Sequence, residues 1–367
     1  MSLCEFDTDI TLDEFSRNVL DHIGSDRYPL SGTIELTPRC SVNCVHCYIN
    51  EAAGDMAVRA KELTTDQWKD ILDQMAEAGT FFLMITGGEP LLRSDFDEIF
   101  QYARRKGMII TLFTNGTLLS KEKAQMLADW NLDQLEISLY GGTKETYEAV
   151  TRTPGSFDRC LAGIQNALDA GLKLALKTVV LKENQHELAL MQEITERFGL
   201  KFRYDGTIWP RLNGDLRTLE HQVPAEVMLN LDLTDPARKE AWQKAQRIAG
   251  DTILRDERVF SCNASLKSFH IDAFGNMNVC MMLRTNKFNL LEKTFKQVWN
   301  GIGEIRQWKR KKSSLCQSCD ATVFCVQCPA FSHVVHGDFE SIVEPICLAA
   351  KQRKVLFNNN NFDIISK

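Results

Sequence analysis

The run Thr37-Pro-Arg-Cys-Ser-Val-Asn-Cys-Val-His-Cys-Tyr48 places Cys40, Cys44 and Cys47 at spacings of four and then three residues. Three thiolates set this closely can hold three corners of a cubane 4Fe–4S cluster, and the loop has no fourth cysteine. One iron of such a cluster keeps a position open for an outside ligand. An open iron beside a substrate pocket indicates chemistry and not electron transfer alone.

Six short apolar segments surround this run in the first part of the chain, at 33–36, 81–85, 109–113, 135–139, 174–181 and 200–204. Each segment is too short for a helix and is bounded by Gly, Asn or Asp, which predicts buried parallel strands. Helices are expected between them, beginning near Thr64, Ser94, Ser156 and Glu187 and ending at Gly79, Gly107, Gly171 and Gly199.

Six strands, each followed by a helix, predict an α/β fold, a partial (β/α)6 TIM-like barrel. The active site of such a fold lies at the carboxyl ends of the strands. The cysteine run follows the first strand, so we expect it at that mouth. A smaller, cysteine-rich iron–sulfur domain is expected at the C-terminus.

Composition excludes several classes of protein. The net charge of −6 disfavours a nucleic-acid binder with a broad basic surface. No run approaches the ~20 apolar residues of a membrane helix, and no signal peptide is recognisable, so we expect a cytoplasmic protein with no membrane partner. Its 12 cysteines then indicate metal ligands, because a reducing compartment disfavours disulfides. Cys4 and Cys160 stand apart from the clusters and are interpreted as incidental.

A second motif, Thr86-Gly-Gly-Glu-Pro90, follows the second predicted strand. Two glycines let the backbone approach a ligand closely, and Glu89 supplies a carboxylate for a cation such as an ammonium group. Alone, the motif would indicate only a tight strand-to-helix turn. Its position one strand from the cysteine run favours a cofactor site.

The C-terminal part of the chain holds a second cysteine field, formed by Cys262, Cys280, Cys316, Cys319, Cys325, Cys328 and Cys347. Seven thiolates suit two iron–sulfur clusters better than one zinc ion. A zinc ribbon is the alternative, since paired cysteines also make Cys4 zinc sites. For the first loop a zinc site is the weaker interpretation, because His46 would be a strained fourth ligand.

The cysteine run and the Gly-Gly-Glu-Pro turn resemble those of the radical S-adenosylmethionine (SAM) superfamily from about residue 31 onward. The resemblance implies that Cys40, Cys44 and Cys47 hold a 4Fe–4S cluster whose open iron binds the amino and carboxylate groups of SAM. It further implies a set of SAM-contacting residues, namely Tyr48, Gly87, Gly88, Glu89, Pro90, Ser138 and Arg152.

The C-terminal field resembles a SPASM domain, the auxiliary-cluster extension of peptide-modifying radical enzymes. The resemblance assigns a distal cluster to Cys316, Cys319, Cys325 and Cys347. It assigns the nearer cluster to Cys262, Cys280 and Cys328, one thiolate short of four. Cys325 and Cys328 are separated by two residues, where relatives often have three.

The implied cofactors are SAM and three 4Fe–4S clusters. The implied electron source for the SAM-binding cluster is a low-potential donor of the flavodoxin or ferredoxin type. The implied reaction cleaves SAM to a 5′-deoxyadenosyl radical, which abstracts a hydrogen atom from a peptide or protein side chain. The product would be a net oxidation, such as a thioether or carbon–carbon crosslink. One alternative is a decarboxylase or dehydrogenase of a small molecule such as a tetrapyrrole side chain, and another is a non-catalytic zinc-ribbon protein.

The predicted organisation is an N-terminal extension over 1–30, a barrel over 31–235, a helical linker over 236–261, the auxiliary-cluster domain over 262–350 and a tail over 351–367. Two further segments are expected near the site. Residues 202–211 end the sixth strand at the mouth, and residues 309–312 form a short basic run ahead of Cys316.

Overall fold

The computed structural model describes residues 18–19, 22–24, 26–49, 51–249, 257–284, 287–311 and 314–358. Most of the predicted N-terminal extension, Cys4 included, lies outside these residues. Among the described residues, no helix has the length and apolar content that crossing a membrane requires.

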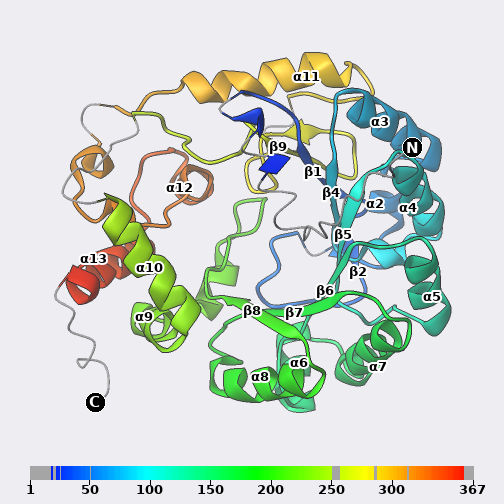
Figure 1. Cartoon of the computed structure of the whole chain (residues 1–367), viewed down its shortest axis with the longest axis horizontal. Helices are drawn as coiled ribbons and strands as arrows, with labels where there is room; N and C mark the ends of the chain where they lie inside the picture. Colours follow the sequence, from blue (N-terminus) through cyan, green and yellow to red (C-terminus); the bar gives the residue numbers. More distant parts are fainter. Residues whose placement is uncertain are drawn as a thin grey trace, which may run out of the picture.

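One eight-stranded sheet forms the centre of the molecule, in the order β10-β9-β1-β4-β5-β6-β7-β8 (Figure 1). The strands are β1 (Ser31–Glu35), β4 (Phe82–Thr86), β5 (Ile109–Thr114), β6 (Gln134–Ser138), β7 (Leu174–Val179), β8 (Lys201–Asp205), β9 (Ser268–Ile271) and β10 (Met277–Asn278). Neighbouring strands run parallel except β9 and β10, and a separate pair joins β2 (Arg39–Cys40) to β3 (Glu51–Ala52). Because β10 and β8 end the order, the described sheet is an open barrel.

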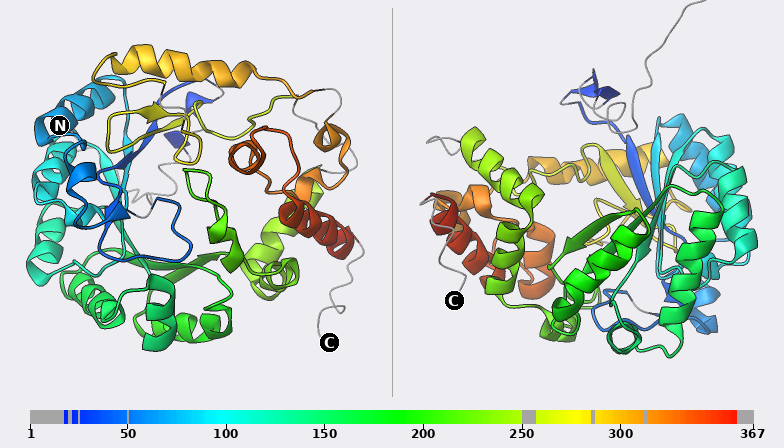
Figure 2. Two further views of the ribbon diagram at one scale, coloured as in Figure 1. Left: turned by 180° about the vertical axis from the view of Figure 1, so that it is seen from behind. Right: turned by 60° about the horizontal axis from the view of Figure 1, so that its bottom comes forward.

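Helices cover the outer face of this sheet (Figure 1). In chain order they are α2 (Met56–Arg59), α3 (Thr65–Glu77), α4 (Phe96–Arg105), α5 (Lys121–Asp129), α6 (Lys144–Thr151), α7 (Ser156–Asp169) and α8 (Leu188–Arg197). The later helices are α9 (Ala225–Thr234), α10 (Pro236–Ala249), α11 (Phe295–Ile302), α12 (Pro329–His336) and α13 (Glu344–Asn358). Figure 2 shows α9, α10, α12 and α13 gathered on one side of the molecule, away from α3 to α7.

Strand side chains alternate between the two faces of the sheet, as the two-residue period requires. Leu112, Ile137 and Leu176 are fully buried in the core that contains the helix residues. Their sequence neighbours, such as Phe113 and Glu136, point to the opposite, concave face and are only half-buried. We call this concave face the lumen.

The predicted fold class and the six predicted strands are confirmed. The two further strands come from the cysteine-rich segment, because Ser268 pairs with Ser31 and extends the sheet beyond β1. The predicted boundary at 262 therefore separates residues that share one sheet. Helices α9 and α10 are separated at Asp235–Pro236, because proline cannot continue the preceding helix. Residues 351–358, predicted as tail, continue α13.

Candidate active site

The three N-terminal thiols come together beyond the carboxyl end of β1. Cys40 ends β2, Cys44 is buried, and the Cys47 N–H donates to the Cys44 carbonyl at 3.2 Å. Burial, Glu89 and the neighbouring thiol raise the pKa of Cys40 to about 12, and burial with the other two thiols raises the pKa of Cys44 well above its usual range. Crowded thiols of this kind bind as thiolates only when a metal supplies positive charge. The donor set therefore fits the iron–sulfur cluster that the resemblance implies.

The cysteine loop is fixed to the strands and helices beside it. The Asn43 N–H donates to the carbonyl of Thr151 at the end of α6, at 2.9 Å. The Asn115 amide, directly after β5, donates to Cys40 Sγ at 3.5 Å and to Ser41 Oγ at 3.0 Å. These hydrogen bonds fix the position of the cysteine loop relative to β5 and α6.

The Gly-Gly-Glu-Pro turn lies directly against the run that precedes Cys40. The Gly88 N–H donates to the Thr37 carbonyl at 2.7 Å. A Cβ atom on Gly87 would meet Thr37 O at 2.3 Å, and one on Gly88 would meet Arg39 O at the same distance. Gly87 also has a φ of +146°, which disfavours other residues. The two glycines therefore allow the backbones of the turn and the cysteine run to touch.

Glu89 is fully buried, and its carboxylate joins the ends of β4 and β5. Oε1 accepts from Leu91 N at 3.1 Å and Thr114 Oγ1 at 2.8 Å, and Oε2 accepts from Asn115 N at 2.8 Å. Burial raises the pKa of Glu89 to about 7 despite these donors. A carboxylate can accept about four hydrogen bonds, so one position on Oε2 is left for the predicted ammonium contact. That contact stays a prediction.

Ser138 and Tyr140 lie beside the three thiols. Burial and then the thiol of Cys44 raise the pKa of Tyr140. The side-chain hydrogen bond with Ser138 offsets only part of this rise. Ser138, predicted to contact SAM, therefore contacts a tyrosine that in turn lies beside the cysteine thiols. The Tyr140 ring packs edge-on against His46 with centroids 4.8 Å apart.

The other predicted SAM contacts occupy different surroundings. Arg152 is exposed at the end of α6 in the left-handed region, with a φ of 49°, next to Thr151, which binds the cysteine loop. Pro90 begins a short 3₁₀ turn. The Tyr48 hydroxyl, predicted to lie by the adenine, donates to Glu35 Oε1 at 3.4 Å.

Glu35 forms a buried polar cluster that sequence reasoning missed. It ends β1, is 1% exposed, and pairs with Arg284 and, at 3.4 Å, with His270 of β9. Burial alone would raise its pKa, but His270 and Arg284 lower it to about 2. The cluster connects the cysteine-run side of the barrel with the C-terminal segment. A glutamate between the apolar residues Ile34 and Leu36 was the available indication.

The C-terminal thiols fall into two spatial sets. Cys280 lies near enough to Cys328 and Cys262 that, after burial, their charges help raise its pKa to about 11. The pKa of Cys325 is raised in the same way, by burial and then by the other members of its set, which are Cys316, Cys319 and Cys347. The structure thus brings together the same two sets that the resemblance implied.

Among the described residues, no group of three histidine, cysteine, aspartate or glutamate side chains is placed to hold a single metal ion.

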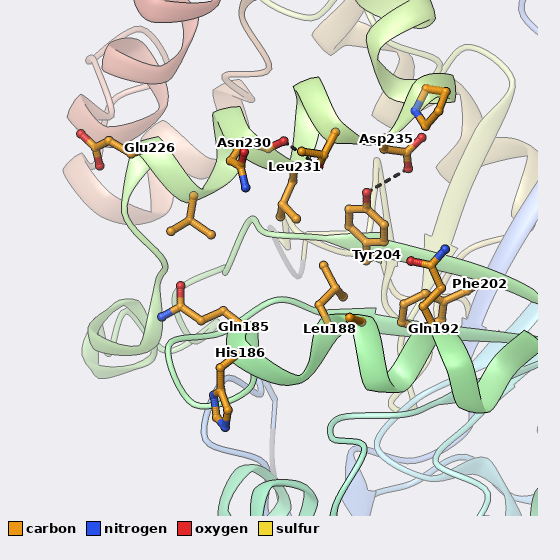
Figure 3. A pocket seen from close by; sticks show the side chains of 14 residues that line it. Gln185, His186, Leu188, Gln192, Phe202, Tyr204, Glu226, Asn230, Leu231 and Asp235 are labelled. Atoms are coloured by element: carbon orange, nitrogen blue, oxygen red, sulfur yellow. Dashed lines mark hydrogen bonds between the residues drawn. The ribbon is translucent and has the colours of Figure 1, made fainter. Parts of the chain in front are cut away.

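A groove of about 990 Å³ lies away from the thiols, between α8 and α9 on the outer side of β8 (Figure 3). Its floor includes Phe202 and Tyr204, and Tyr204 Oη donates to Asp235 at 2.9 Å. Residues 202–211 were expected at the barrel mouth as a unit. Instead, Phe202 and Tyr204 face this outer groove, while the intervening Arg203 projects from the other side of the strand.

Comparison with known proteins agrees with this arrangement. The family model described as "Radical SAM superfamily" matches residues 34–194, and the SPASM model, described as "Iron-sulfur cluster-binding domain", matches residues 262–320. Mycofactocin maturase MftC of Mycolicibacterium smegmatis is 30% identical over 79% of this chain and 75% of its own.

The chain belongs to the radical SAM superfamily. This radical SAM protein carries a C-terminal SPASM domain and is an enzyme of that superfamily. It is also similar to the AdoMet-dependent heme synthase of Methanosarcina barkeri, with 28% identity over 87% of this chain and 96% of that protein.

Solved structures share the fold of this radical SAM protein. Streptococcus suis SuiB bound to S-adenosylmethionine superposes with a TM-score of 0.67 and 19% identity, over 95% of this chain and 83% of SuiB. The enzyme anSMEcpe with bound AdoMet gives a TM-score of 0.65 and 14% identity, over 91% of this chain and 100% of that one. At these identities the likeness establishes the architecture alone.

Proposed function

We propose that this radical SAM enzyme oxidatively modifies a side chain of a peptide or protein. The observation that carries the proposal is the grouping of Cys40, Cys44 and Cys47 at the mouth of a barrel whose sheet stays open. When bound there, the cluster and SAM supply a 5′-deoxyadenosyl radical that removes a hydrogen atom from the substrate.

The chain's own residues position these groups. Gly87 and Gly88 bring the turn against the cysteine run, and Glu89 fixes that turn to β5. We propose that Ser138 and Arg152 contact SAM from β6 and from the end of α6. The surrounding buried side chains exclude water from the radical, which prevents side reactions.

The two C-terminal thiol sets support two auxiliary 4Fe–4S clusters, giving three clusters in all. We propose that Cys316, Cys319, Cys325 and Cys347 ligate one completely. Cys262, Cys280 and Cys328 leave one position on the other for a further ligand. A low-potential flavodoxin or ferredoxin would supply the electrons, and reduced cysteines in this number favour the cytoplasm.

Two observations support a peptide substrate. MftC, one of the relatives, is named a maturase, and SuiB has been solved with its precursor peptide SuiA. In addition, β8 is an edge strand bordered by the outer groove, and edge strands and grooves are common docking places for extended peptides.

A tetrapyrrole substrate is the second candidate. The heme synthase of M. barkeri matches this chain over 96% of its own length, against 75% for MftC. On this basis the enzyme would act on a side chain of a porphyrin.

Co-expression decides between the two candidates. The enzyme is produced with each short peptide encoded beside its gene, and the peptides are analysed by mass spectrometry; purified enzyme is separately incubated with iron-coproporphyrin III. We expect a mass loss in one peptide, absent with a Cys44→Ala variant. Conversion of the porphyrin with every peptide unchanged would overturn the peptide proposal. Absence of 5′-deoxyadenosine in all reactions would overturn both.

A further inference from the structure

We propose that Lys177 and Arg203 form a site in the lumen that binds a carboxylate group of the substrate. This inference deepens the proposed function and rests on it only for the entry of substrate into the lumen. The shared chemistry is a carboxylate, carried either by a peptide or by a tetrapyrrole propionate.

The register of the sheet places the two cations side by side. Ser138 of β6 is paired with Lys177 of β7, and Lys177 is paired with Arg203 of β8. Paired residues of parallel strands project from the same face, about 4.8 Å apart. Since Leu176 is buried on the helix side, its neighbour Lys177 projects into the lumen.

One acid serves both cations. Arg203 Nη2 lies 2.5 Å from Glu136 Oε2, and Lys177 Nζ lies 3.4 Å from the same oxygen. A guanidinium has five N–H donors and an ammonium three, so a single shared oxygen leaves most donors without a partner in this cluster. When Lys177 is protonated, the cluster carries one excess positive charge.

Lys177 is unusual for a lysine because its side chain is only 22% exposed. Its Nζ lies 2.8 Å from the centroid of the Phe113 ring, which projects into the lumen from β5, two strands away. Burial lowers its pKa to about 7, and Glu136 offsets only part of that effect. An incoming carboxylate would supply the missing counter-charge.

Lys177 and Arg203 lie next to the proposed SAM contact Ser138. Ser138, the register partner of Lys177, hydrogen-bonds Tyr140, whose pKa responds to the cysteine thiols. A carboxylate held by Lys177 would thus place the adjoining carbon atoms of the substrate near the SAM contacts. Asp205 shares the face of Arg203, but its Oδ1 accepts from Thr207 N at 2.9 Å.

Chemical labelling tests the site without requiring turnover. Acetic anhydride acylates neutral amines, so its rate at Lys177 is followed by mass spectrometry in reconstituted enzyme with SAM. Three matched pairs of probes are added: glutarate and glutaramide, N-acetyl-trialanine and its C-terminal amide, coproporphyrin III and its tetramethyl ester. Exposed Lys173, just before β7, serves as the internal control.

We expect at least one free acid to slow acylation of Lys177 about tenfold, as a charge-assisted hydrogen bond predicts, while its uncharged counterpart leaves the rate unchanged. Protection by the tripeptide acid identifies a peptide source, and protection by coproporphyrin III alone identifies a propionate. Equal effects of acid and uncharged partner, or no protection by any acid, would overturn the proposal.

Variants give an independent measurement. Once the substrate is identified by co-expression, Lys177→Met and Arg203→Met should each raise its KM about tenfold, with Lys173→Met as the matched control. An unchanged KM in both variants contradicts the carboxylate site. Failure of the proposed function is separate, because it would appear as absent 5′-deoxyadenosine in the wild type, whereas the labelling result does not depend on it.

Discussion

Gly88 determines how closely the turn after β4 approaches the cysteine run. In Gly88→Ala the new Cβ would meet backbone oxygens of Arg39 and Pro38 at 2.3 and 2.6 Å, which cannot move as a side chain would. We expect about 1–3 kcal/mol lower stability and a loss of bound iron. Denaturant unfolding and iron analysis measure both.

Gly54→Ala is the matched control, because nothing lies within 4 Å of its added Cβ. It should keep wild-type stability and iron content. If Gly88→Ala behaves like this control, the close contact between turn and cysteine run has no structural importance.

Lys177 also makes a prediction about pH. Its folded pKa of about 7 lies below the ordinary 10.5, so the unfolded chain binds more protons between these values. Stability therefore rises with pH from about 7 to 10, by at most about 1.4 kcal/mol per unit for one group. Below pH 7 both states are protonated and the contribution is constant.

The measurement is the difference in unfolding free energy between the wild type and Lys177→Met across this pH range. Other titrating groups cancel in the difference, which should move in favour of the wild type as pH rises. A difference that does not change with pH would show that Lys177 titrates as a solvated lysine.

At the scale of elements, Asp232 joins three helices of the C-terminal side. It lies on α9, is fully buried, and binds Arg238 of α10 at 2.7 Å and Arg353 of α13 at 2.6 Å. Replacing it with Ala leaves the 2%-exposed Arg353 charge without its partner, which should cost about 3–5 kcal/mol. Urea unfolding measures the loss.

Asp158→Ala is the comparison for that variant, since it removes the partner of Lys144 in an exposed pair. Exposed pairs contribute little, so its unfolding midpoint should stay at the wild-type value. Equal losses in the two variants would contradict the role of Asp232 as a buried connection.

Much of the barrel was predictable because its elements carry local patterns. The apolar segments bounded by Gly, Asn or Asp matched β1 and β4 to β8, and the Thr64 capping box marks the start of α3. Helices α5 and α6 were not predicted, although Ser120 and Thr143 are ordinary N-caps. Strands β9 and β10 were missed because they are short and lie within the cysteine field, and only their pairing with β1 makes them strands.

The residues of the candidate site also fall into those that the sequence indicates and those that only the fold brings together. Cysteine spacing indicates ligands without the fold, so all ten clustered cysteines were recognised as candidate ligands from the sequence alone. Glu35, Lys177 and Arg203 were not, because each becomes significant only when strands distant in sequence lie side by side. A charged residue within an apolar strand, as at Lys177, was the indication available in the sequence.

For the whole molecule, the thiol sets predict the metal content. Reconstituted enzyme should hold about twelve irons, and Cys316→Ala with Cys319→Ala should lose about four of them. Cys160→Ala is the control, because that buried thiol belongs to none of the three sets. The same iron content in the double variant and the wild type, by colorimetric analysis, would refute the distal cluster.

The sheet makes a prediction about truncation as well. A chain ending after residue 249 lacks β9, so β1 becomes an unprotected edge with its hydrogen-bonding groups free to pair between molecules. We expect such a chain to aggregate, as measured by light scattering. A stable, folded monomer would mean that β9 is dispensable for the barrel.

The pairing of β1 with β9 also has a consequence for synthesis on the ribosome. Ser31 emerges early, whereas its partner Ser268 emerges only when most of the chain has been made. Contacts between such distant segments form slowly, because a long loop must first be closed. The strand that leads into the cysteine run therefore acquires its last neighbour late, and the nascent chain carries an uncovered strand beside this run for most of translation.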